Sequence, residues 1–493
     1  MNSCDAIVIG SGAGGAAAAH RLVAAGWRVL MLEKGMPLPT DGSTLDVKRV
    51  VGNGEFLSRE VWLDGKGRRF APEEHFNLGG KTKWYGAALL RFAPHEFDAD
   101  STHQCRAWPI AYRDLAPYYG QAEQLLGVRE FACEPALARI TARMCGRPSG
   151  WYARPLPLAL SADIARDRHE ASHFDGFATV RDLKADAENV LIRSIADAPN
   201  FTLMTGAAVV ALLPAANDGR CVEGVRLADG REFRARHVLL AAGALHSPRL
   251  LEKFLRAGAI QGAPAANVGR NLKLHLLTAM VAVSPSRKND LIRKTTLLLN
   301  DSCPHSSVQA LGFDAELIGN LMPRFVPRAL ARAVGARSYG FFLQTEDGSS
   351  VENRVTEAVP GTTTPVMNYD DRRVDAARRE HRGFVRGLQR ALLGAGLVSF
   401  TQRIGLAGTA HVCGTLVTGN DPLTSVVDAS GRVHGLEGLH VVDGSILPRS
   451  SRVNPSLTIF AWALRTADIL VRVQSMKRSP AVTRFDRAVG APV

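Results

Sequence analysis

The spacing of apolar residues changes three times within the first 35 residues of the chain. Residues 6–9 (AIVI) form a continuous apolar run, which is typical of a parallel strand buried on both faces. The glycine-rich run GSGAGG follows directly, and residues 14–25 then read as a helix that ends at Gly26. Residues 28–32 (RVLML) are expected to form the second strand, whose last four residues are apolar. This order predicts the strand, turn, helix and strand of a Rossmann-type βαβ unit.

A second pattern of short apolar runs begins at Phe201. The turn sequences NDG (217–219) and ADG (228–230) separate three alternating runs, which predicts an antiparallel meander. The last run becomes continuously apolar at residues 237–240, so we expect it to join the parallel sheet. Ser247 and Pro248 then follow as the expected cap and first turn of another helix.

The remaining segments predict a second domain inserted into the first. Residues 276–400 are β-rich, and a helix over 372–392 returns the chain to a buried strand at 439–442 and a helix at 457–471. The predicted fold class is α/β, or α+β overall, in which the Rossmann-type domain is interleaved with a domain built on a mostly antiparallel sheet. We assign residues 1–125, 191–275 and 406–475 to the nucleotide domain, 126–190 and 276–405 to the substrate domain, and 476–493 to a basic tail.

Composition excludes several classes of protein. The 493 residues contain no apolar run of the ~20 residues that a membrane span needs, so we expect no transmembrane segment. The net charge of +13 is spread along the chain without interleaved aromatic residues, which does not indicate nucleic-acid binding. Seven scattered cysteines, without a CxxC pair, predict reduced thiols and no metal site. With no leader sequence before the first strand, we expect a cytoplasmic protein.

The glycine turn indicates dinucleotide binding. Gly10 permits the tight turn, Gly12 lets the backbone approach a pyrophosphate, and Gly15 lets the helix pack against the strand. The start of the following helix offers free N–H groups and a positive dipole to that phosphate. Glu33 ends the second strand, where a carboxylate can bind the hydroxyls of an adenosine ribose.

The last hundred residues carry a second group of polar motifs. Asp443 and Gly444 follow the buried strand at 439–442 and are expected beside the glycine turn. Asn454 and Pro455 precede the last helix, whose positive end suits a ring that becomes anionic when it is reduced, such as that of a flavin.

Six motifs in this order make the chain resemble the glucose/methanol/choline (GMC) family of FAD-dependent alcohol oxidoreductases over most of its length. They are GSGAGG with Glu33, NLGGKTKWYG (77–86), AAGALHSPRLL (241–251), NVGRNL with His275, ENRV, and the run of HVCGT, VVDGS and NPSLTI. The combination of NLGG-T--YG with WPI-Y-DL-PYY resembles the branch that contains sugar and polyol dehydrogenases, pyranose oxidases and aminoglycoside alcohol oxidases.

The resemblance implies which residues form the site. It places the catalytic pair on His411 and Asn454. Loss of a hydride and a hydroxyl proton from an alcohol calls for a base near neutral pKa and a hydrogen-bond partner for the same oxygen. The implied FAD-binding residues are Gly10, Gly12, Ala13, Gly14, Gly15, Glu33, Lys34, Gly79, Gly80, Thr82, Tyr85, Gly86, Ala208, Val209, Ala242, Gly243, Asp443, Gly444, Asn454 and Pro455.

The sequence also departs from the family pattern. Relatives that attach FAD covalently use a histidine after the double glycine, whereas residues 81–85 here read KTKWY, so we predict non-covalent FAD. The expected substrate is an alcohol on a sugar, glycoside or related polyol, and the electron acceptor is oxygen or another molecule. Two alternatives stay open: a lyase of the same fold, in which FAD is structural, and the flavoprotein subunit of an electron-transfer complex.

Overall fold

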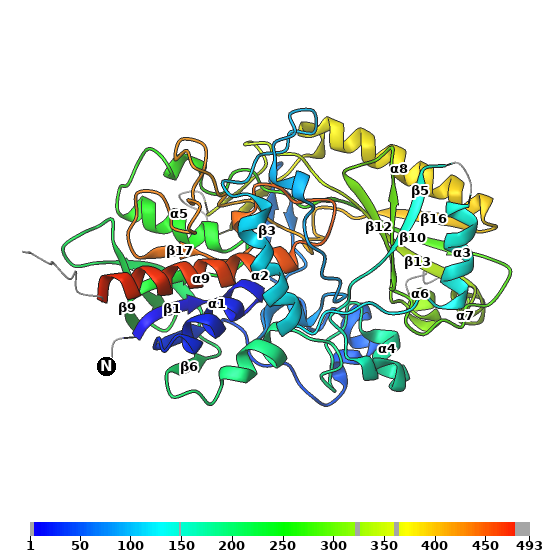
Figure 1. Ribbon diagram of the computed structural model, residues 1–493, viewed down its shortest axis with the longest axis horizontal. Coiled ribbons are helices and arrows are strands. Elements are labelled where there is room, and N and C mark those ends of the chain that lie inside the picture. The colour runs from blue at the N-terminus through cyan, green and yellow to red at the C-terminus, as the bar shows by residue number, and fades with distance from the viewer. Residues whose placement is uncertain (1–3, 147–148, 321–325, 359–363, 479–493) are drawn as a thin grey trace, which may run out of the picture.

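Two large sheets lie at opposite ends of the molecule's long axis (Figure 1). The computed structural model describes residues 4–146, 149–320, 326–358 and 364–478. The basic tail predicted for 476–493 therefore lies outside the described residues from 479 onward.

The first sheet has a parallel core. Its strands are β1 (Cys4–Ile9), β2 (Val29–Leu32), β6 (Phe201–Met204), β9 (Glu232–Leu240) and β17 (Leu439–Val441), in the order β6-β2-β1-β9-β17. Helix α1 (Ala13–Ala24) carries the buried small residues Ala16–Ala19, which let the last helix, α9 (Ser456–Arg478), pack beside it. The first and last segments of the chain thus meet, as the sequence predicts for a Rossmann-type domain.

Strand β9 belongs to two parts of this sheet. Its first half pairs antiparallel with β8 (Val222–Leu227), which pairs with β7 (Val209–Pro214), and its second half lies between β1 and β17. The predicted meander and its return to the parallel sheet are confirmed. The first of the three predicted runs is divided, however, because the chain turns at Gly206 (φ +66°). Its beginning, β6, pairs with β2 instead of joining the meander.

The second sheet is antiparallel throughout, as expected for the second domain. Its strands are β5 (Trp151–Pro155), β10 (Leu276–Val283), β11 (Thr296–Asn300), β12 (Ser306–Ala310), β13 (Ser338–Thr345) and β16 (Val398–Arg403), in the order β16-β10-β13-β12-β11-β5. Helices α3 (Pro135–Cys145) and α8 (Asp375–Gly394) flank it, as Figure 1 shows.

The two faces of this sheet differ in polarity. On one face Val308 of β12 and Phe341 and Leu343 of β13 pack in an apolar core with α3 and α8. Because side chains alternate along a strand, Gln309 and Gln344 lie on the opposite face. Both are fully buried, so this opposite face is covered by another part of the protein.

A third sheet joins segments that the sequence assigned to different domains. Strands β3 (Trp62–Asp64) and β4 (Arg69–Phe70) form it with β14 (Arg354–Thr356) and β15 (Val366–Asn368). The sequence analysis did not anticipate this sheet, since strands of two or three residues show no clear alternation. The predicted domain boundaries stay predictions.

The remaining α-helices are α2 (Tyr112–Leu125), α4 (Arg168–His173), α5 (Ser247–Ala257), α6 (Ala315–Asn320) and α7 (Arg328–Gly335). Ser247 is the first residue of α5, and the prediction that it caps this helix is wrong. Its hydroxyl donates to Asp443 at 2.5 Å instead. Among the described residues, no helix has the length and apolar character needed to cross a membrane.

Candidate active site

The glycine turn after β1 is enclosed by backbone on three sides. A Cβ at Gly10 would lie 2.4 Å from the carbonyl oxygen of Ala241, which follows β9, and Gly10 has φ +102°. A Cβ at Gly14 would lie 1.9 Å from the carbonyl oxygen of Val442, after β17, and one at Gly15 would lie 2.0 Å from that of Gly10. These three glycines let the turn fit between the ends of β1, β9 and β17.

Gly12 has a different environment. A Cβ at this position would meet no heavy atom of the described residues within 4 Å. Helix α1 begins here without a side-chain cap and without an acidic residue in its first turn. Gly80 approaches from a second loop, where its Cβ would lie 3.1 Å from the Gly12 Cα. Open space, free N–H groups and a helix dipole together fit the diphosphate of a dinucleotide.

Two buried carboxylates stabilise the edges of this turn. Glu33 accepts hydrogen bonds from the amide N (2.9 Å) and Oγ (2.5 Å) of Ser11 and from the amide of Gly35 (2.7 Å). Asp443 accepts from the amide of Gly243 at 2.9 Å and from Ser445 Oγ at 2.5 Å. Both acids lie at the carboxyl ends of parallel strands, where they fix the loops around the predicted nucleotide site.

The loop with the double glycine is held by its own side chains. Thr82 Oγ1 donates to the carbonyl of Gly79 (2.6 Å) and accepts from the amide of Ala187 (3.0 Å). The Tyr85 hydroxyl donates to the carbonyl of Ala185 at 2.6 Å. The side-chain oxygens of these two predicted FAD-binding residues therefore bond the protein, which leaves the loop backbone to face a ligand.

The Lys184 ammonium also holds this loop in place. It is fully buried and donates to the carbonyls of Lys83 (3.0 Å) and Tyr85 (2.8 Å), as well as to those of Phe174 and Phe177. Burial lowers the pKa of Lys184 to about 7. The three N–H donors of the ammonium are shared among these four carbonyls, and the two that belong to the loop, those of Lys83 and Tyr85, tie it to Lys184.

Other predicted cofactor residues belong to segments outside the glycine turn. Residues 207–209 lie beside Glu33, whose carbonyl accepts from the amide of Ala207 at 2.8 Å. Lys34 Nζ lies 3.6 Å from the ring centroid of Phe76. Gly86 gives room to an ion pair, because its Cβ would lie 2.0 Å from Asp175 Oδ1 and 2.2 Å from Lys294 Nζ.

The structure brings the two predicted catalytic residues together. Asn454 Nδ2 lies 3.2 Å from His411 Nε2, although 43 residues separate them in the chain. His411 is only 9% exposed, and its ring lies edge-on to His275 and to Phe342 of β13. Its Nδ1 is buried, and among the described residues it has no hydrogen-bond partner.

The surroundings of His411 keep its imidazole neutral. Burial lowers the pKa of His411 well below the usual 6.5. The positive charges of Lys294 and Lys81 lower this pKa further, with a contribution from His275. At neutral pH the ring is unprotonated, so it can take a proton from a bound hydroxyl group.

Sequence reasoning missed the polar residues of the second sheet that contact Asn454 or the segment before it. Gln309 Nε2 on β12 donates a short hydrogen bond to Asn454 Oδ1. Ser307 Oγ (2.6 Å) and Gln344 Nε2 (2.8 Å) donate to the carbonyl of Arg452, two residues before Asn454. The feature of the sequence that could have indicated them is the polar run SSVQA, which the structure shows to be a strand buried along its whole length.

Buried carboxylates hold the segment 449–454 that carries Asn454. Glu346, after β13, accepts from Arg449 Nε (2.9 Å) and Nη2 (2.7 Å) and from the amide of Ser451 (3.1 Å). Glu96 accepts from Ser451 Oγ at 2.7 Å and from the amide of Arg452 at 2.9 Å. Ser451 has a φ of +66°, a strained value for a non-glycine residue that these bonds maintain.

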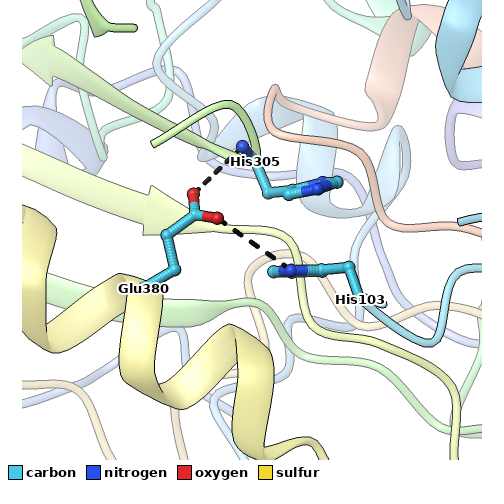
Figure 2. A group of neighbouring side chains, drawn as sticks. All are labelled: His103, His305 and Glu380. Atoms are coloured by element: carbon cyan, nitrogen blue, oxygen red, sulfur yellow. Dashed lines mark hydrogen bonds and ion pairs between the residues drawn. The ribbon is translucent and has the colours of Figure 1, made fainter. Parts of the chain in front are cut away.

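A histidine cluster extends this network away from the catalytic pair. His305 Nε2 lies 3.2 Å from Asp100 Oδ2, and its Nδ1 lies 3.2 Å from Glu346 Oε2. Although burial opposes it, the surrounding carboxylates raise the pKa of His305 above its usual value. Figure 2 shows Glu380 between the backbone of His305 and the ring of His103.

This cluster fits ion pairing better than metal coordination. The rings of His103 and His305 stack with centroids 3.7 Å apart and planes 15° apart (Figure 2). Imidazole lone pairs lie in the ring plane, so those of two stacked rings do not converge on one ion. Both ring nitrogens of His305 already face carboxylates. We therefore interpret the cluster as an imidazolium paired with carboxylates.

Sequence models of the GMC oxidoreductase family match residues 4–277 and 353–463. The chain belongs to this family. Members of the GMC family bind FAD, and the chain is an oxidoreductase that acts on CH–OH donors as an oxidase or a dehydrogenase.

Several relatives are similar over nearly the whole chain. The 6'''-hydroxyparomomycin C oxidase of Streptomyces lividus is 32% identical over 94% of this chain and 90% of that protein. The paromamine 6'-oxidase of Streptomyces fradiae is 30% identical with the same coverage. The 2-methyl-1,2-propanediol dehydrogenase of Mycolicibacterium austroafricanum is 24% identical over 95% of each chain.

Solved structures share the fold. Pyridoxine 4-oxidase from Mesorbium loti superposes with a TM-score of 0.68 at 19% identity, over 95% of this chain and 99% of that chain. Formate oxidase from Aspergillus oryzae RIB40, as an R554A variant, superposes with a TM-score of 0.69 at 16% identity, over 97% and 99%. These likenesses confirm the predicted fold class of a parallel FAD sheet with an antiparallel second sheet.

The different surroundings of the glycines give a test of the cofactor site. Gly12→Ala adds a methyl group where the protein leaves open space, so we expect a folded protein whose affinity for FAD falls by about tenfold or more, because the backbone can no longer approach the diphosphate. FAD affinity is measured by titrating the apoprotein, and folding by circular dichroism. Gly219→Ala, at an open position in the meander, is the matched control. Wild-type affinity in Gly12→Ala would contradict the assignment.

Proposed function

We propose that this GMC oxidoreductase oxidises an alcohol group on a polyhydroxylated ring, such as a sugar, glycoside or aminocyclitol-containing compound, with His411 as the proton acceptor. The observation that carries the proposal is the buried, neutral His411 with the Asn454 amide 3.2 Å away. This arrangement supplies both groups that an alcohol oxygen needs when it loses a proton.

The residues of the site suggest how the reaction proceeds. The substrate hydroxyl gives its proton to His411 Nε2 while Asn454 Nδ2 donates a hydrogen bond to the same oxygen. The carbinol carbon loses a hydride and becomes a carbonyl carbon, and FAD, when bound, supplies the hydride acceptor.

The polar face of the second sheet supports a substrate with several hydroxyl groups. Gln344 Oε1 on this face is a buried acceptor without a hydrogen-bond partner among the described residues. A site with such an acceptor favours ligands that bring donors and rejects those that leave the acceptor unpaired. The two Streptomyces relatives, an oxidase of 6'''-hydroxyparomomycin C and one of paromamine, support the same substrate class.

A panel of alcohols tests the substrate class. We expect sugars, glycosides or aminoglycosides such as paromamine to bleach the oxidised flavin absorbance under anaerobic conditions, because they bring several hydroxyl donors to the polar face of the second sheet. Aryl alcohols, choline and sterols serve as comparison substrates. Reduction by apolar alcohols alone would overturn the substrate class but not the family. Turnover of a cyanohydrin with a flavin that no alcohol bleaches would instead indicate the lyase alternative.

We also propose that FAD is bound non-covalently. The support is the KTKWY sequence after Gly80, which offers neither histidine nor cysteine at the usual attachment positions. Acid precipitation should therefore release all yellow colour into the supernatant, measured by absorbance. Flavin that stays with the denatured chain would refute this proposal.

A further inference from the structure

Gln309 donates a hydrogen bond to Asn454, one of the two proposed catalytic residues, and reaches the proposed base His411 only through it. It lies on β12, is fully buried, and its Nε2 donates to Asn454 Oδ1. The other end of the Asn454 carboxamide, Nδ2, lies 3.2 Å from His411 Nε2. The three side chains thus form a chain of hydrogen bonds that begins on the second sheet and ends at the base.

A carboxamide can turn by 180° with little change in shape, because its oxygen and nitrogen are nearly equal in size. The backbone before Asn454 is fixed by Ser307 and Gln344, which both donate to the Arg452 carbonyl. These bonds place the Asn454 side chain but do not decide which end of the amide faces His411. That choice depends on the group opposite the other end, where Gln309 presents its Nε2 as the donor, while Gln309 Oε1 has no hydrogen-bond partner among the described residues.

We propose that Gln309 is a positioning residue, which acts through Asn454 by fixing the amide so that its N–H end faces His411 and the substrate oxygen. This inference rests on the proposed function, since it concerns the residue that orients the proposed proton acceptor. Gln309 itself needs no contact with substrate or cofactor for this role.

The orientation decides the state of His411. When Nδ2 donates to His411 Nε2, that nitrogen carries a lone pair and can accept a proton. The reversed amide would place Oδ1 against Nε2, which favours a protonated nitrogen and removes the donor to the substrate oxygen. Gln309 therefore keeps the base in its reactive form.

Other groups around His411 also influence its pKa. They are the Lys294–Asp175 pair (2.8 Å) and the Lys81–Glu74 pair, and the imidazole of His275 is a further titratable neighbour. All lie on segments other than β12, so a substitution at Gln309 leaves them in place. A change in the titration of His411 then reports on the orientation of Asn454.

A double-mutant cycle tests the proposal. Gln309→Met keeps the length of the side chain but cannot orient the amide, and Asn454→Ala removes the amide. We expect Gln309→Met to slow flavin reduction at neutral pH by about tenfold and to move the pH profile by about one unit toward higher pH. In the Asn454→Ala background, Gln309→Met should change neither the rate nor the profile.

Gln402→Met is the matched control, because Gln402 lies on β16 of the same sheet but is exposed. It should behave like the wild type, and thermal unfolding with FAD content verifies that each variant folds. An equal loss of rate on both backgrounds would show that Gln309 acts independently of Asn454 and would overturn the proposal. A wild-type pH profile in Gln309→Met would also overturn it.

A second readout does not require turnover. In holoenzyme labelled with ¹⁵N-histidine, the spectrum of His411→Gln identifies the His411 signals. We expect an unprotonated Nε2 in the wild type and a protonated fraction in Gln309→Met. An identical His411 spectrum in both would contradict the proposed role of Gln309. If no alcohol reduces the flavin but the spectrum changes as expected, the proposed function fails while the role of Gln309 stands.

Discussion

The backbone of residues 449–454 is held by two buried carboxylates, and the position of Asn454 in the proposed catalytic pair depends on this restraint. Glu346 and Arg449 are almost completely buried, and a buried ion pair of this kind repays its desolvation only when its geometry is good. Removing one partner of such a pair typically costs about 3–5 kcal/mol, because the other charge stays buried. The main effect of the pair is therefore to give the segment one defined conformation, including the strained backbone of Ser451. Its contribution to the net stability of the fold is smaller.

This restraint connects the two large sheets. Ser451 lies on the segment between β17 and α9, and its carbonyl accepts a hydrogen bond from His275 Nε2 (2.8 Å). The ring of His275 packs against that of His411. From the other side, Gln309 reaches the Asn454 amide. In the proposed function, the part with the glycine turn supplies the base His411, and the second sheet contacts its partner Asn454, so both parts contribute to the site. Burial then keeps His411 neutral, and a neutral histidine can serve as a base.

Sequence patterns predicted those parts of the structure that local chemistry determines. The glycine turn, the meander and the parallel strands follow from spacing within short segments, and His411 and Asn454 followed from motifs. Gln309 and Glu96 were missed because their partners lie 145 or more residues away, and a polar residue does not reveal a partner so distant in the chain. Ser247 shows the same limit, since a hydroxyl at a helix start can bond a distant carboxylate instead of the helix.

The most direct test of this account is the rate of flavin reduction in His411→Ala, measured by anaerobic rapid mixing with an alcohol that reduces the wild-type flavin. The account predicts that the variant binds FAD, because His411 does not belong to the nucleotide turn, and that reduction slows by ~10² to 10⁴, the usual contribution of a positioned acid or base. Reduction at the wild-type rate would show that His411 is not the proton acceptor.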